Sequence, residues 1–140
     1  MYTEGSGFTE IFCEEIYRCN LDKNNPVIYD LGAHVGVYSI YCSLNYKNSR
    51  IFSYECVRQT FNVAKENTRK FKDNITLKNR AISDKLGKSI ISLGDHHGGN
   101  FINYGTPSSN HKVEAIVSST LAHEMKVNKT EYIDILKIDI

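Results

Sequence analysis

The residues with the clearest potential for chemistry are an acid and two glycines, Asp30, Gly32 and Gly36, in the segment Asp-Leu-Gly-Ala-His-Val-Gly. Apolar residues precede this segment and an amphipathic pattern follows it, so the chain is expected to turn from a strand into a helix here. Such a turn presents backbone N–H groups and the positive end of a helix dipole, which bind anions and polar cofactors. A tight turn without a ligand is the alternative.

The spacing of the glycines excludes two common phosphate-binding patterns. His34 and Val37 stand where the dinucleotide fingerprint G-x-G-x-x-G requires glycine. No Gly-Lys-Ser/Thr follows Gly32 at the distance that a phosphate-cradling loop requires. The pattern that remains is Asp30-x-Gly32-x-x-x-Gly36.

A second acid, Glu55, follows the apolar run Ile51-Phe-Ser-Tyr54 and lies 19 residues after Gly36. An acid at the end of the second strand of a βαβ unit, about 20 residues beyond the glycine turn, is placed to bind a ribose. A carboxylate suits this task because it only accepts hydrogen bonds and can accept them from both hydroxyls of a diol. The alternative is a solvated carboxylate at the end of a strand.

The elements that position these residues alternate between strand and helix patterns. Runs of β-branched and aromatic residues indicate strands, and apolar residues at i, i+3, i+4 and i+7 indicate helices. We expect strands at residues 27–29, 51–54, 75–82, 89–93, 113–117 and 132–140, and helices at 8–19, 37–44, 58–71 and 120–125. This order predicts an α/β fold with a doubly wound, mostly parallel, Rossmann-like sheet whose last strand lies beside its first.

Three segments resemble a known family of enzymes. Asp30-x-Gly32-x-x-x-Gly36 is similar to the first motif of class I methyltransferases that use S-adenosylmethionine (SAM), and residues 28–39 as a whole resemble the FkbM-type methyltransferase family. Residues 80–87 and 136–140 resemble that family's Ser-Asp and Lys-Ile-Asp segments.

The chain departs from the family pattern at two positions. His34 stands where the family usually has Asn, and Cys56 follows Glu55 where the family usually has Pro.

The resemblance implies a class I methyltransferase fold with SAM as the cofactor and a hydroxyl oxygen of a small molecule or glycan as the methyl acceptor. The residues expected to contact SAM are Asp30, Gly32, Ala33, Gly36, Glu55, Ala81 and Ser83, the last two beside the adenine. Asp139 would lie beside Gly32 at the methyl-donor end. Asp139 or a histidine of the 94–111 loop is the candidate general base.

The composition limits the binding partners, the cellular location and the metal or disulfide chemistry that we expect. The chain has 140 residues with 17 basic and 16 acidic side chains, and it contains no long basic run, so we expect no nucleic-acid or membrane partner. It shows neither a secretion signal nor an apolar stretch of membrane-spanning length, which favours a cytoplasmic protein. The four cysteines are interpreted as reduced thiols, and His96-His97 lacks the ligand spacing of a metal site.

We expect an N-terminal helix and linker in residues 1–25 and a SAM-binding domain in residues 26–140. The resemblance implies about three further strands and a Glu-Gly pair after Ile140, so the chain is expected to be a fragment with an unpaired apolar edge strand that favours self-association. Two alternative functions stay open: an NAD- or nucleotide-binding Rossmann enzyme, and a non-catalytic Rossmann-like module. The oligomeric state stays open as well.

Overall fold

The computed structural model describes residues 8–14, 16–93, 101–103 and 112–140. Its central sheet has four parallel strands in the order β3-β2-β1-β8, with bounds β1 Val27–Leu31, β2 Arg50–Glu55, β3 Ile75–Asn79 and β8 Ile135–Ile138. The last strand pairs with the first, Asp30 lying opposite Lys137 in the register. The prediction of a parallel α/β sheet with adjacent first and last strands is confirmed.

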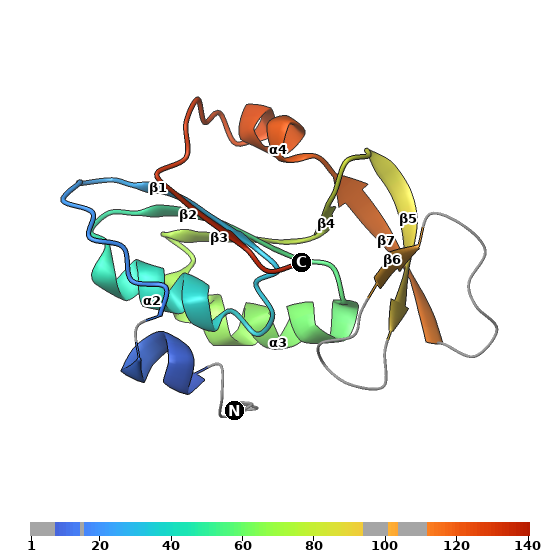
Figure 1. Ribbon diagram of the computed structural model, residues 1–140, viewed down its shortest axis with the longest axis horizontal. Coiled ribbons are helices and arrows are strands. Elements are labelled where there is room, and N and C mark those ends of the chain that lie inside the picture. Colours follow the sequence, from blue (N-terminus) through green and yellow to red (C-terminus); the bar gives the residue numbers. More distant parts are fainter. Residues whose placement is uncertain (1–7, 15, 94–100, 104–111) are drawn as a thin grey trace.

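Helices cover both faces of this sheet (Figure 1). The helices α2 (Val37–Asn45) and α3 (Arg58–Thr68) lie on one face, and α3 continues as the short 3-10 helix η2 (Arg69–Phe71). The helix α4 (Leu121–Val127) lies over the other face. The doubly wound, Rossmann-like arrangement expected from the sequence is therefore present.

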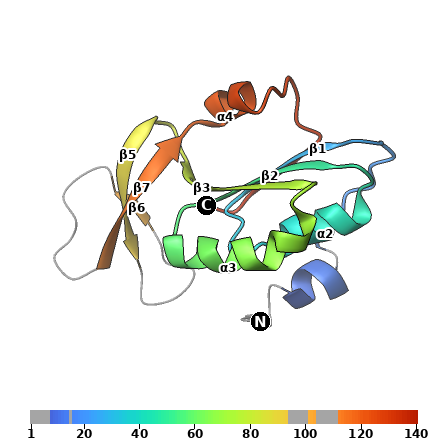
Figure 2. The ribbon, with the colours of Figure 1, turned by 180° about the vertical axis from the view of Figure 1, so that it is seen from behind.

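A second sheet was not expected from the sequence. It has the order β4-β7-β5-β6, with bounds β4 Ala81–Ile82, β5 Gly87–Leu93, β6 Phe101–Asn103 and β7 Lys112–Ser119. The expected third strand, residues 75–82, divides at Arg80, and its second part pairs with β7 instead of β2. Figure 2 shows this sheet beyond the end of the central sheet at which the chain terminates.

The predicted N-terminal helix over residues 8–19 is wrong in length. Among the described residues of that range, the helical element is η1 (Thr9–Cys13), a single π-helical turn. The hydroxyl of Tyr46 binds both backbone groups of Cys19, accepting from its N–H at 3.1 Å and donating to its carbonyl at 2.9 Å. This tertiary contact satisfies backbone groups that a longer helix would have used, and therefore overrides the apolar periodicity.

Two tyrosines and an acid form a buried polar network between the sheet and α4. Tyr29 and Tyr54 are 0% and 1% exposed, and the amide of Asn128 donates to both hydroxyls. The carboxylate of Glu124 on α4 accepts hydrogen bonds from the Tyr54 hydroxyl at 3.1 Å, from Lys78 Nζ at 2.8 Å and from Arg80 Nη1 at 2.6 Å. Burial by itself raises the pKa of Glu124, but hydrogen bonds, the largest from Lys78, outweigh burial and lower it to about 2.

We expect Glu124→Gln to lower the free energy of unfolding by about 3 kcal/mol at pH 7, because the buried carboxylate loses its charge-assisted hydrogen bonds from Lys78 and Arg80. A carboxyl whose pKa is lowered on folding stabilises the protein above its unfolded-state pKa and stops doing so as the pH falls through its folded-state pKa. The difference between wild type and variant should therefore shrink as the pH falls from 4.5 toward about 2.

Urea denaturation at several pH values measures this difference. Glu131→Gln, the same substitution at an exposed position, is the matched control and should change the free energy of unfolding by less than about 0.5 kcal/mol. A Glu124→Gln difference that stays constant across that pH range would contradict the network described here.

Candidate functional site

The glycine turn after β1 is glycine-rich because of what lies against it. Gly32 has φ +80°, and a Cβ on it would overlap the backbone carbonyl of Asp139. Gly36 has φ +85°, and a Cβ on it would lie 2.9 Å from the Cγ2 of Thr68 on α3. Both residues are thus required by left-handed backbone and by close packing against β8 and α3, a role that glycine has in other strand-to-helix turns.

The amides of this turn donate inside the fold. The N–H groups of Gly32 and Ala33 both donate to the carbonyl of Tyr54, at 3.0 and 2.8 Å, and that of Gly36 donates to the carbonyl of Ala33. The sequence predicted that the turn would offer N–H groups to an anion, and for these three amides that prediction is wrong. The turn follows β1 directly, so its amides lie against the end of the neighbouring strand β2.

Glu55 ends β2 and is bound to the same turn. Its Oε2 accepts from the His34 N–H at 2.9 Å, and its Oε1 accepts from the Val57 N–H at 2.9 Å. The side chain is only 7% exposed, and burial raises its pKa while the two amides oppose that shift. Because both carboxylate oxygens accept hydrogen bonds from the backbone, this arrangement fixes the orientation of the carboxylate.

The ends of β2 and β3 hold one another at this edge. The N–H of Arg80 donates to the carbonyl of Glu55 at 3.1 Å, and the side-chain amide of Asn79 donates to the carbonyls of Glu55 and Cys56. The Asn79 contact restrains the loop at Cys56.

Ala81 and Ser83, the two residues expected beside the adenine, contact different parts of the structure. Ala81 is buried in an apolar cluster with Val57, the residue whose amide binds Glu55. Ser83 lies in the turn between β4 and β5, where its N–H donates to the carbonyl of Ser119. Of these two residues, Ala81 is therefore linked to Glu55 through Val57, whereas Ser83 contacts the second sheet.

Asp139 and Asp30 lie on the other side of the turn. The backbone N–H of Asp139 donates to the carbonyl of Leu31, and its side chain is 71% exposed. Asp30 is fully buried, and its Oδ2 accepts from the hydroxyl of Ser39 on α2 at 2.6 Å. Burial raises the pKa of Asp30, and Lys137 opposes the shift. In this structure Asp30 supports the turn from inside the fold, while Asp139 faces outward.

Lys137 is the lysine of the Lys-Ile-Asp segment, and the sequence alone assigned it no role. Its ammonium donates to the carbonyl of Gly32 at 3.1 Å and lies 3.3 Å from Asp30 Oδ1 and 3.5 Å from Asp139 Oδ2. Its side chain is only 8% exposed. A lone basic residue inside the apolar run of the last strand was the signal that could have identified it.

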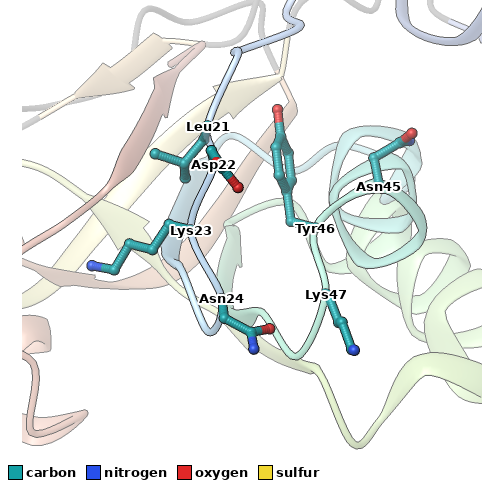
Figure 3. A pocket seen from close by; sticks show the side chains of 7 residues that line it. All are labelled: Leu21, Asp22, Lys23, Asn24, Asn45, Tyr46 and Lys47. Atoms are coloured by element: carbon teal, nitrogen blue, oxygen red, sulfur yellow. The ribbon is translucent and has the colours of Figure 1, made fainter.

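A separate hollow lies at the opposite end of β1 and α2 from the glycine turn. It has a volume of about 370 Å³ and lies between the segment before β1 and the end of α2 (Figure 3). Its lining consists of Leu21, Asp22, Lys23, Asn24, Asn45, Tyr46 and Lys47. Among these, Lys23 already pairs with Asp134 at 2.8 Å. None of the expected site residues lines this hollow.

Several expectations concern groups other than the cofactor. The four cysteines form no disulfide. In the part of the chain that the structure describes, no three His, Cys, Asp or Glu side chains are grouped to hold a metal ion. The expectation about His96 and His97, and the candidate base in the 94–111 loop, fall on residues outside the described ranges. Among the described residues we find no helix with the length and apolarity that a membrane crossing requires.

Comparison with known proteins gives partial structural matches only. No protein-family model matches the sequence, and no curated protein matches it. The precorrin-6y C5,15-methyltransferase of Geobacter metallireducens is 33% identical over 40% of this chain and 30% of its own, with a TM-score of 0.37. TYW2 of P. horikoshii, solved with MeSAdo, is 22% identical over 49% of this chain and 26% of its own, with a TM-score of 0.42.

A SAM-dependent methyltransferase from Aquifex aeolicus is a third match, 14% identical over 61% of this chain and 50% of its own, with a TM-score of 0.40. In each of these three comparisons the match spans half or less of the other protein.

We expect Gly32→Ala to destabilise the protein by about 4 kcal/mol or more, because the new methyl group overlaps the Asp139 carbonyl and also occupies left-handed backbone. Gly87→Ala is the matched control, because Gly87 also has positive φ, +128°, but nothing lies within 4 Å of the place that a Cβ on it would take. It should cost only the backbone strain, about 2 kcal/mol. Thermal unfolding of both variants measures the difference, and equal losses would contradict a steric origin.

Proposed function

We propose that this chain binds SAM at the edge formed by the glycine turn, Glu55 and Asp139, and transfers its methyl group to a hydroxyl oxygen of a small molecule or glycan. The observation that carries the proposal is the contact between Glu55 Oε2 and the His34 amide. It joins the acid after the second strand to the turn after the first, which is the pairing that recognition of a ribose beside such a turn requires.

In this proposal, residues at the carboxyl ends of three neighbouring strands contact different parts of SAM. Glu55 ends β2 and would accept the ribose hydroxyls. Ala81 and Val57, packed together beside it, would contact the adenine. Asp139 follows β8, on the other side of β1, and would face the methyl end of the donor. The order β2-β1-β8 therefore supports a donor that lies across the end of β1.

When bound, SAM supplies an electrophilic methyl group on a sulfonium. The chain's contribution is to hold the donor and acceptor in line and to receive a proton from the acceptor hydroxyl. The exposed carboxylate of Asp139 is the described group best placed to take that proton. The choice of a hydroxyl acceptor rests on the resemblance to the FkbM-type family.

A nucleotide-binding enzyme is the competing proposal, because an acid such as Glu55 also binds the ribose of NAD. NAD additionally carries a diphosphate, which Rossmann enzymes hold with amides of the glycine turn. Here the amides of Gly32, Ala33 and Gly36 already donate to carbonyls of the protein. This favours an adenosyl ligand without a diphosphate.

We expect SAM to bind the wild-type protein and Glu55→Gln to weaken that binding by about 10- to 100-fold, which is the loss of hydrogen bonds to a charged group. Isothermal titration calorimetry measures the dissociation constant, with NAD as the competitor. Glu66→Gln, the same substitution on the exposed surface of α3, is the control and should leave the constant unchanged.

Two results would contradict the proposal. Displacement of SAM by NAD at similar concentrations would favour the nucleotide-binding enzyme. An undiminished affinity in Glu55→Gln would remove Glu55 from the site and favour a non-catalytic module.

A further inference from the structure

Lys137 stands where the pattern of the strand calls for an apolar residue. Successive side chains of a strand alternate between faces, so Lys137 shares its face with Ile135. Ile135 is 6% exposed and belongs to the apolar cluster under α2 that includes Ile28 and Ile51. An isoleucine or methionine at position 137 would continue this cluster, and a buried ion pair is often no more stabilising than such a residue. Core stability alone therefore does not account for the lysine.

The contacts of the ammonium account for it better. Lys137 Nζ contacts three acceptors that belong to different parts of the site: the Gly32 carbonyl in the turn, Asp30 in β1 and Asp139 after β8. Asp30 Oδ1 makes no hydrogen bond to the described residues although it lies 3.3 Å from Nζ. The ammonium thus lies between all three groups and does not form a well-aligned hydrogen bond with Asp30, its partner across the strands.

Two aromatic rings limit the movement of the ammonium. The ring centroid of Tyr38 on α2 lies 5.8 Å from Nζ, and that of Tyr17 lies 5.9 Å away. The two rings contact one another edge to face, with centroids 5.5 Å apart. Rings at this distance attract a cation and restrict it, so the position of Nζ is determined by the surroundings as well as by the strand.

The turn is consequently held from both sides. Glu55 holds it from β2 through the His34 amide, and Lys137 holds it from β8 through the Gly32 carbonyl. The same ammonium lies 3.5 Å from one carboxylate oxygen of the exposed Asp139. The backbone of Asp139 is held by its N–H, which donates to the Leu31 carbonyl, and the position of Nζ therefore bears on the orientation of its carboxylate.

We propose that Lys137 is a positioning residue that sets the methyl-donor half of the site, by holding the Asp139 carboxylate and the Gly32 carbonyl on one ammonium. This inference rests on the proposed SAM site. It predicts that the two halves of the donor are held separately: the adenosyl half by Glu55 and its neighbours, and the sulfonium and amino-acid half by the geometry that Lys137 imposes.

Two ligands that differ only in the second half test this inference. SAM fills both halves, whereas 5′-methylthioadenosine has the adenosyl group and lacks the amino-acid part and the sulfonium charge. We expect Lys137→Met to weaken SAM binding by about tenfold, the size of one hydrogen bond to a charged group, and 5′-methylthioadenosine binding by less than about twofold. Titration calorimetry on the full chain measures both dissociation constants.

Three further variants make the result specific. Lys137→Arg, which keeps the charge and the donors, should restore SAM binding to within about threefold of wild type. Lys137→Gln, which removes the charge but stays polar, should show the same selective loss as Lys137→Met and replaces it should that variant not fold. Lys126→Met, at an exposed lysine of α4, is the matched control and should bind both ligands as wild type does.

The opposing results are distinct. Equal weakening of both ligands in Lys137→Met and Lys137→Gln, or no weakening in either, would overturn the positioning role, as would a failure of Lys137→Arg to restore SAM binding. A wild-type protein that binds neither ligand would overturn the SAM site itself and this inference with it. A wild type that binds both ligands while Lys137→Met loses both equally would leave the SAM site standing and remove only the role of Lys137.

Discussion

The close approach of the backbone directly after β8 to Gly32 is the constraint on which the rest of the site depends. The carbonyl of Asp139 occupies the space that any side chain at position 32 would need. On its other side the turn lies against the end of β2, where its amides donate to the Tyr54 carbonyl and to Glu55. Three strand ends are thereby brought to one edge, although they lie far apart in the sequence.

Charged side chains around this contact connect buried parts of the fold to the residues of the site. Asp30, fully buried, and Lys137, almost fully buried, lie below the turn, whereas Asp139 lies outside it. A second buried group, Glu124, connects α4 to Lys78 on β3 and to Arg80, whose amide binds the carbonyl of Glu55. Both networks end on residues that hold the turn or Glu55, so the stability of the two helical layers and the geometry of the site are linked.

Patterns that depend on near neighbours in the chain were the ones the sequence predicted well. The bounds of α2, β2 and α3, the positions of Gly32 and Glu55 at the ends of β1 and β2, and that of Gly36 just before α2 follow from local periodicity and turn chemistry. The pairing of β8 with β1 followed from the rule that parallel strands joined by helices cross over with one hand. The division of residues 75–82 at Arg80 did not, because Ala81 and Ile82 pair with Ser118 and Ser119 of β7, which are distant in the sequence.

The sequence by itself determined the alternation of strands and helices in the central sheet, the glycine turn and the acid that follows the second strand, because each is set by residues within a few positions. Only the tertiary structure decided what these groups contact. It showed that the turn's amides donate to Tyr54 and Glu55, that Tyr46 holds Cys19 out of a helix, and that Lys137 joins Gly32 to two carboxylates. Such contacts join segments separated by up to 105 residues, and no local pattern records which polar groups meet when the strands come together.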